Sequence, residues 1–241
     1  MASMLSAGAL ARVIDHTILK AEATEAQVRQ MVAEAVEYRF ASVCVNPRHA
    51  LLVARLLEEA QVADETQTDR PVLTCACVGF PLGANTTLTK TIEAGSCVKD
   101  GAQEIDMVIS VAALLEDDLD YARHDVQEVV KAARAVRRQT VVKVIMETAL
   151  LNEEQIALGC KAAQHGGADF VKTSTGFHPA GGATVQAVQW LKKYAGPAGM
   201  KVKAAGGIRD LATAQVMLEA GADRLGCSAS VAIVRACGVG V

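Results

Sequence analysis

The chain has 241 residues, and its 24 basic and 27 acidic side chains give a formal net charge of −3. Hydrophobic residues make up 51% and charged residues 21%, a balance that excludes an extended disordered chain. The aromatic content of 3% and the nearly balanced charge also argue against a nucleic-acid binder, so we expect a small-molecule partner.

Short β-branched segments alternate with longer amphipathic segments along the whole chain, a pattern typical of parallel sheet with crossover helices. Successive predicted strands end 22 to 36 residues apart, which is room for one strand, one loop and one helix. The eight predicted strands are Val13–Asp15, Ser42–Val45, Val72–Val78, Glu104–Ile109, Val141–Ile145, Phe170–Lys172, Lys201–Ala204 and Arg224–Gly226.

The segments between these strands predict helices. Thr24–Tyr38 opens on an N-cap threonine, Pro47–Glu59 opens on a proline, and Leu119–Arg138 carries one apolar stripe. Eight such units in about 240 residues predict a single-domain α/β protein, a (β/α)₈ TIM barrel spanning residues 1–241. An open doubly wound sheet is the alternative, but no G-x-G-x-x-G follows the first strand to make it dinucleotide-binding.

Cysteine and histidine spacings disfavour a metal site. The seven cysteines cannot all pair within one chain, Cys75 and Cys77 form C-x-C rather than C-x-x-C, and the five histidines are dispersed. We therefore expect reduced thiols, a cytoplasmic protein and no bound metal. Met1 to Leu10 lacks the pattern of a secretion signal, and no run of about 18 apolar residues predicts a membrane span.

Four of the predicted strands carry charges at positions where barrel strands are usually apolar. These residues are Asp106, Lys143, Lys172 and Lys203, and they fall toward the strand ends where barrel enzymes place their active sites. One interpretation is a set of ion pairs that neutralise one another. The other is catalysis by a lysine amine that forms a Schiff base with a carbonyl.

Several neighbouring lysines suit that chemistry, because only a neutral amine attacks a carbonyl and a free lysine titrates at about 10.4. At about 6 Å and an effective dielectric constant of about 20, two positive charges repel by about 2.8 kcal/mol, or about two pKa units. A nearby aspartate would shuttle protons. Spacing alone does not identify the nucleophile.

Glycine-rich segments follow the last two strands, where barrels commonly bind phosphate. Gly206, Gly207 and Arg209 follow the seventh strand, and Gly226 and Ser228 belong to the segment that leads from the eighth strand into a helix. Glycines admit close backbone approach, and a helix N-terminus offers free N–H groups. Tight turns and helix ends also use glycine, so each pair alone is a weak signal.

Together these motifs resemble the class I deoxyribose-phosphate aldolase family over nearly the whole chain. The matching segments are Asp15-His16-Thr17-Ile18-Leu19-Lys20, Val43-Cys44-Val45-Asn46-Pro47, Glu104-Ile105-Asp106-Met107-Val108, Lys143-Val144-Ile145-Met146-Glu147-Thr148, Phe170-Val171-Lys172-Thr173-Ser174-Thr175-Gly176 and Val202-Lys203-Ala204-Ala205-Gly206-Gly207-Ile208-Arg209.

The resemblance implies a role for each matching residue. Lys172 is the expected Schiff-base lysine, Lys203 the neighbouring cation and Asp106 the proton relay, with Lys143 and Asp15 in support and Asp15 holding Lys203. The residues expected at the substrate and its phosphate are Cys44, Thr173, Gly176, Gly206, Gly207, Arg209, Gly226 and Ser228. Ala229 stands where family members often carry a second serine.

The implied activity is reversible cleavage of 2-deoxyribose 5-phosphate to glyceraldehyde 3-phosphate and acetaldehyde, in deoxyribose phosphate catabolism, with no metal or organic cofactor. The expected partners are these small molecules and a second copy of the chain in a dimer or tetramer. The alternatives are another lysine-dependent aldolase or transaldolase, a phosphate-binding isomerase or synthase, and a noncatalytic sugar-phosphate-binding barrel.

Overall fold

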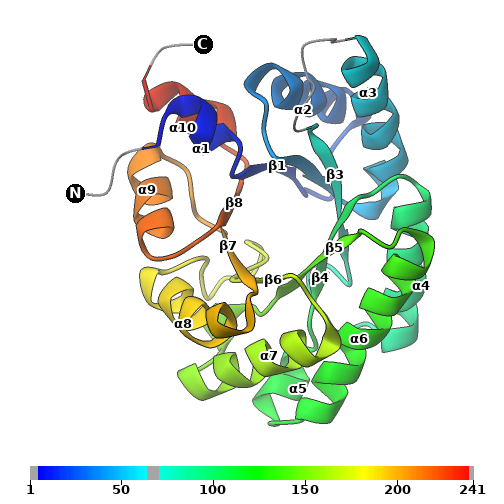
Figure 1. Cartoon of the computed structure of the whole chain (residues 1–241), viewed down its shortest axis with the longest axis vertical. Coiled ribbons are helices and arrows are strands. Elements are labelled where there is room, and N and C mark those ends of the chain that lie inside the picture. The colour runs from blue at the N-terminus through cyan, green and yellow to red at the C-terminus, as the bar shows by residue number, and fades with distance from the viewer. Residues whose placement is uncertain (1–4, 64–70, 239–241) are drawn as a thin grey trace.

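A computed structural model describes residues 5–63 and 71–238. Its eight strands are all parallel and close into a barrel in sequence order, so that β1 pairs with both β2 and β8. Figure 1 shows the strands at the centre with the helices around them. The strands are β1 (Ile14–Ile18), β2 (Ser42–Val45), β3 (Leu73–Val78), β4 (Glu104–Val108), β5 (Val141–Ile145), β6 (Phe170–Lys172), β7 (Lys201–Ala205) and β8 (Arg224–Cys227).

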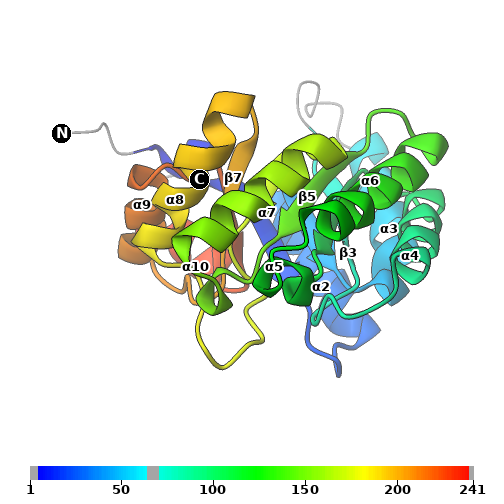
Figure 2. The ribbon, with the colours of Figure 1, turned by 90° about the horizontal axis from the view of Figure 1, so that it is seen from below.

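Helices connect the strands and cover the outside of the barrel, as the turned view in Figure 2 shows. The α-helices are α1 (Ala7–Ala11), α2 (Glu25–Tyr38), α3 (Ala50–Ala63), α4 (Thr87–Lys99), α5 (Val111–Leu115), α6 (Leu119–Val136), α7 (Glu153–Gly166), α8 (Val185–Ala195), α9 (Leu211–Glu219) and α10 (Ser230–Ala236). Three short 3₁₀ helices are η1 (Pro47–His49), η2 (Thr148–Leu150) and η3 (Gly196–Ala198).

Within the described ranges, none of the helices combines the length and the apolar character that crossing a bilayer requires.

Alternation along each strand separates two environments. The outward side chains, such as Val43, Ile105, Val144 and Val202, are buried with the inner faces of the helices in the main hydrophobic core. Inward side chains are polar or charged on several strands, because successive residues of a strand point to opposite faces. The barrel interior is therefore where the unusual chemistry of this sequence collects.

The predicted (β/α)₈ barrel is confirmed; β2, β5 and β6 have the predicted bounds, and the strand ends that differ are shifted by one to three residues. The largest shift is in β1, which runs to Ile18 because its pairing with β2 continues through Ile18 and Val45. Thr24 caps α2 as predicted, and forms a capping box with Gln27.

The helix predicted over Pro47–Glu59 differs in its first turn and in its end. Pro47 opens a 3₁₀ turn, in which the His49 N–H donates to the Asn46 carbonyl, and the α-helix begins at Ala50. The α-helix then continues to Ala63, and Gln61 Nε2 donates to the carbonyls of Leu57 and Val72, linking the last turns to the chain just before β3.

Candidate active site

Strand register brings the charged residues together inside the barrel. Asp106 of β4 lies opposite Lys143 of β5, and Lys172 of β6 lies opposite Lys203 of β7. All four side chains are buried, and Lys172 retains 2% of its exposure. The sequence motifs on four separate strands therefore form one cluster.

Asp106 is the centre of this cluster. Its Oδ2 accepts hydrogen bonds from Lys172 Nζ and Lys203 Nζ, each at 2.7 Å, and its Oδ1 accepts from Lys143 Nζ at 2.8 Å. The Cys75 thiol also donates to Oδ1, at 3.2 Å. Lys172 Nζ and Lys203 Nζ therefore lie close to each other, because both donate to the same oxygen of Asp106.

A second carboxylate, Asp15 of β1, holds Lys203 from the other side. Asp15 Oδ2 lies 2.5 Å from Lys203 Nζ, and its Oδ1 accepts from Ser42 Oγ at 2.7 Å and from Arg224 Nη1 at 2.6 Å. Glu104 extends the network by lying 2.6 Å from Lys143 Nζ. Asp15 thus contacts Lys203, the residue that the family resemblance implies it holds.

These contacts fix the charges of four residues of the network, the two aspartates and two of the lysines. Burial by itself would raise the pKa of Asp106 and Asp15, but the surrounding cations outweigh it and hold both pKa values well below the usual range. Burial would lower the pKa of Lys143 and Lys203, but Asp106 and the other anions outweigh it and raise both pKa values well above the usual range. Lys143 and Lys203 thus stay ammonium ions.

The charge inventory of the network is unbalanced by one. It contains four cationic side chains, Lys143, Lys172, Lys203 and Arg224. It contains three carboxylates, Asp15, Glu104 and Asp106. With Lys172 as a neutral amine the positive and negative charges cancel, and uncompensated buried charge is costly.

Gly226 provides the space that lets Lys203 reach Asp15. It lies opposite both Asp15 of β1 and Ala205 of β7, on the strand between the two strands that the Lys203–Asp15 ion pair joins. A Cβ on Gly226 would lie 2.9 Å from Ala205 Cβ and 3.1 Å from Lys203 Cε. The expected phosphate glycine therefore also serves the lysine cluster.

A pocket of about 520 Å³ opens above this cluster, at the carboxyl ends of β1, β6, β7 and β8. Three basic residues line it, Lys20, Lys172 and Arg209, and none of its lining residues is acidic. Lys172 is the member of the cluster whose side chain reaches the pocket. The remaining lining residues are Thr17, Ile18, Leu19, Gln27, Met31, Thr175, Gly176, Phe177, Ala205, Gly206, Gly207, Ile208, Gly226 and Ser228.

The pocket contains six of the eight residues expected at the substrate, namely Gly176, Gly206, Gly207, Arg209, Gly226 and Ser228. It does not include Cys44 or Thr173. Cys44 is buried in a small cluster with Leu19, Cys75 and Cys77, and Thr173 Oγ1 exchanges hydrogen bonds with the backbone of Ala205. Both side chains lie behind the pocket wall, because they pack inside the barrel and against β7.

Among the pocket residues that sequence reasoning did not assign to the site are Lys20, Gln27, Met31 and Phe177. Lys20 is the last residue of the β1 motif, and Phe177 directly follows Gly176, the last residue of the β6 motif. Gln27 and Met31 lie on α2, and only the packing of that helix over the β1 end reveals them.

Cys44, Cys75 and Asp106 place one ligand atom each within 4.8 Å of the others, close enough to consider a metal ion. Burial raises the pKa of Cys75 well above 9.0. A hydrogen bond from Cys75 lowers the pKa of Cys44, but contact with Cys77 and burial outweigh it and raise this pKa too. Protonated thiols, beside a carboxylate that already accepts hydrogen bonds from three lysine amines, do not suit a cation.

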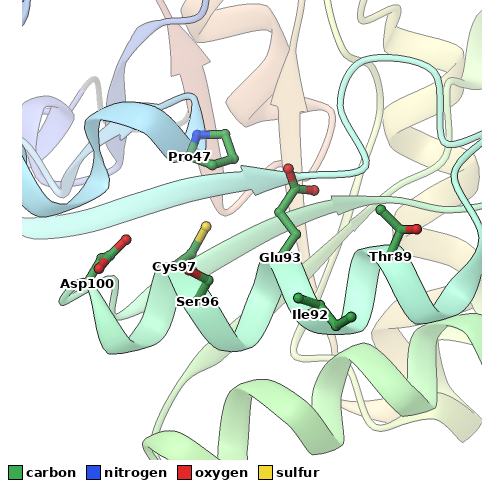
Figure 3. Close-up of a pocket in the computed structure, with 7 residues that line it drawn as sticks. All are labelled: Pro47, Thr89, Ile92, Glu93, Ser96, Cys97 and Asp100. Atoms are coloured by element: carbon green, nitrogen blue, oxygen red, sulfur yellow. The ribbon is translucent and has the colours of Figure 1, made fainter.

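A second cavity, of about 490 Å³, lies outside the barrel between η1 and α4. Figure 3 shows Glu93 and Cys97 of α4 pointing toward Pro47. Glu93 Oε2 accepts the Gly79 backbone N–H at 2.7 Å, and Cys97 is buried with its pKa raised to about 12 by burial and nearby carboxylates. This cavity has no amine nucleophile and is not the candidate site.

Comparison with known proteins agrees with this geometry. The model of the DeoC/LacD family of aldolases matches residues 9–237. Deoxyribose-phosphate aldolase of Enterococcus faecalis is 48% identical over 225 residues, which cover 93% of this chain and 96% of that protein.

Solved structures give the same result. A deoxyribose phosphate aldolase from Aeropyrum pernix, described as having a unique tetrameric structure, is 34% identical with a TM-score of 0.85, covering 96% of this chain and 92% of that one. An aldolase called QR15 is 38% identical with a TM-score of 0.82, covering 94% and 95%.

Proposed function

Since the chain belongs to the DeoC/LacD family of aldolases, and is therefore a lyase, we propose that it reversibly cleaves 2-deoxyribose 5-phosphate to glyceraldehyde 3-phosphate and acetaldehyde. One observation carries the proposal. Lys172 lines the cationic pocket while its Nζ lies 2.7 Å from Asp106 Oδ2, inside a cluster of buried ion pairs. No other lysine of this cluster reaches the pocket within the described residues.

The reaction begins when neutral Lys172 adds to the carbonyl carbon of the open-chain sugar. Two features favour the neutral amine: the charge balance of the network, and the permanent ammonium of Lys203 on the same carboxylate oxygen. Asp106 Oδ2, 2.7 Å away, accepts a hydrogen bond from Lys172 Nζ and holds the amine in place. The carbinolamine then takes up one proton from solvent and loses water, which gives a protonated imine.

The imine draws the electrons of the bond between the second and third carbons. As that bond breaks, the hydroxyl of the third carbon gives its proton to water, and the third carbon becomes the aldehyde carbon of glyceraldehyde 3-phosphate. The electron pair remains as an enamine on Lys172. Protonation of the enamine carbon and addition of water release acetaldehyde and restore the amine. Asp106 Oδ2 accepts hydrogen bonds from both Lys172 Nζ and Lys203 Nζ. It therefore links the nitrogen whose charge changes during the reaction, that of Lys172, to Lys203, which stays protonated.

The anionic end of the sugar phosphate suits the other half of the pocket. Lys20 and Arg209 line it with no carboxylate partner in the described part of the chain. Gly206 and Gly207 have positive φ values of 92° and 83°, a conformation that brings backbone close to a ligand. Ser228 adds a hydroxyl.

Turnover is tested with the purified chain and 2-deoxyribose 5-phosphate, by following acetaldehyde through reduction by alcohol dehydrogenase and loss of NADH. Wild-type protein should produce acetaldehyde and glyceraldehyde 3-phosphate in equal amounts. Lys172→Met should be inactive, whereas Lys161→Met, at an exposed position of α7, should match wild type. Different products would indicate another lysine-dependent aldolase, and sugar-phosphate binding without products would contradict the proposal.

A further inference from the structure

A buried carboxylate outside the lysine cluster has no part in the reaction described so far. Glu147 follows β5 directly after Met146 and is 4% exposed. Its backbone is in the left-handed region, with φ 55° and ψ 57°. Residues other than glycine adopt this conformation at a cost, and they keep it where surrounding contacts fix them.

The residues before and after Glu147 each donate one backbone hydrogen bond, and these two bonds fix the backbone of Glu147. The N–H of Met146 donates to the carbonyl of Lys172, and the N–H of Thr148 donates to the carbonyl of Thr173, both at 2.9 Å. The chain on each side of Glu147 is thus tied to β6 and the residue after it. The Glu147 side chain is held toward the loop that follows Lys172.

In that loop Glu147 binds Thr175 twice. Glu147 Oε1 accepts the Thr175 backbone N–H at 3.3 Å, and Glu147 Oε2 accepts the Thr175 hydroxyl in a short hydrogen bond. Thr175 Oγ1 in turn accepts the backbone N–H of Phe177 at 3.1 Å. A threonine hydroxyl can donate one hydrogen bond and accept others, so all three contacts are compatible. They form one chain from Glu147 to Phe177.

The residues held by this chain form one wall of the pocket. Thr175, Gly176 and Phe177 all line it, starting three residues after Lys172. Gly176 packs closely on Gly206, since a Cβ added to Gly206 would lie 3.3 Å from Gly176 Cα. Phe177 meets Phe80 edge to face, with ring centroids 5.2 Å apart, and so joins this wall to the loop after β3.

We propose that Glu147 is a positioning residue, which acts through Thr175 to hold Gly176 and Phe177 against the sugar phosphate. This inference rests on the proposed function, because it assigns Glu147 to substrate positioning at the same pocket. Lys172 itself is held by β6 and by Asp106, neither of which depends on Glu147. Loss of the Glu147–Thr175 contact therefore affects the part of the substrate beyond the imine, and leaves the amine in place.

Thr175→Val and Thr175→Ser form the matched pair that tests this. Valine keeps the shape of threonine and removes both hydroxyl contacts, whereas serine keeps them. We expect Thr175→Val to lower kcat/KM for 2-deoxyribose 5-phosphate by about tenfold or more, since small misplacements of a reacting group are costly. Borohydride trapping of acetaldehyde on Lys172 should stay at the wild-type level, and serine should restore most of the activity.

A double-mutant cycle assigns the effect to Glu147. Glu147→Gln weakens the charge-assisted bond to Thr175, and we expect a smaller loss of kcat/KM than with valine. The Glu147→Gln, Thr175→Val double variant should lose no more than Thr175→Val alone, because Glu147 acts through that hydroxyl. Glu154→Gln, at an exposed position of α7, is the control for removing a carboxylate.

Three results would overturn the inference: equal activity of the valine and serine variants, additive losses in the cycle, or a parallel fall in acetaldehyde trapping and turnover. A merely structural role would lower the melting temperature without separating the two assays. Failure of the proposed function has a different signature, because the wild-type protein itself would then trap no acetaldehyde on Lys172.

Discussion

Replacing Lys203 by methionine removes the cation closest to the proposed nucleophile while keeping a long unbranched side chain. Lys172 Nζ and Lys203 Nζ each lie 2.7 Å from Asp106 Oδ2, so they are at most about twice that distance apart. With an effective dielectric constant of about 20, two positive charges at about 5.4 Å repel by about 3 kcal/mol. This repulsion corresponds to about two pH units.

The sign of the effect follows from the charge that Lys203 carries. Its ion pairs with Asp106 and Asp15 outweigh burial and raise its pKa above 10.5, so Lys203 is an ammonium ion throughout the neutral range. In Lys203→Met the repulsion between the two lysine side chains is absent, while the attraction of Asp106 remains. The acidic limb of the pH–rate profile should therefore move about two pH units higher.

The assay is the rate of acetaldehyde production between pH 5 and 10, with Lys201→Met as the control. Lys201 begins the same strand, but its side chain is exposed and lies over the Phe170 ring. We expect Lys203→Met to recover part of its activity as the pH rises, and Lys201→Met to follow the wild-type profile. A Lys203→Met profile that is reduced equally at every pH would refute the electrostatic reasoning.

Three further predictions concern the phosphate end and the stability of the barrel. In steady-state assays, Lys20→Met should raise KM for 2-deoxyribose 5-phosphate about tenfold, because one charge-assisted contact is lost. KM for unphosphorylated 2-deoxyribose should stay unchanged. An equal rise for both sugars would contradict a role of Lys20 in phosphate binding. Lys90 and Asp125 form a fully buried ion pair at 2.5 Å, so Lys90→Met should lower the free energy of unfolding in urea by about 3–5 kcal/mol. The double variant Lys90→Met, Asp125→Leu should recover most of this loss, because neither charge is then left buried alone. A Lys90→Met variant as stable as wild type would be inconsistent with this prediction. The pKa values of Asp15 and Asp106 lie below the ordinary 3.8, so the stability that these carboxylates contribute is complete above pH 3.8 and is lost as the pH falls below it. The free energy of unfolding should therefore fall more steeply with decreasing pH in wild type than in Asp15→Asn. Equal slopes for the two proteins would argue against this prediction.

Much of the fold could be predicted because each strand carries its own local signal. The β-branched runs place the strands to within a few residues, and Thr24 marks the start of α2 through its side chain. The ends were less certain because pairing with the neighbouring strand decides them, as in β1. The first turn after Pro47 became a 3₁₀ turn, a local choice that proline at the start of a helix does not determine.

The lysine cluster could be predicted as a group, but its internal order could not. Charges on neighbouring strands of a barrel must meet inside it, so the strand motifs bring Asp106 and the three lysines together. Which lysine opens into the pocket depends on the depth of each side chain, and the sequence shows no depth. The same limit applies to Cys44 and Thr173, which belong to matching motifs but lie behind the pocket wall.

Residues contributed by loops were the hardest to foresee. Lys20 ends one recognisable motif and Phe177 follows another, but only the closed barrel brings the end of β1 beside β8 and the loop after β6 against Phe80. Glu147 gave no signal beyond its place in a motif. Its importance follows from a left-handed backbone and from two contacts with Thr175, and both depend on tertiary structure.

The central claim is that Lys172 forms the covalent intermediate, and its most direct test is borohydride reduction in the presence of acetaldehyde followed by peptide mass spectrometry. A reduced two-carbon adduct on Lys172, absent from Lys172→Met and unaffected in Lys161→Met, is the predicted result. Folded protein that remains unmodified, or that carries the adduct on Lys143 or Lys203 instead, would contradict the account.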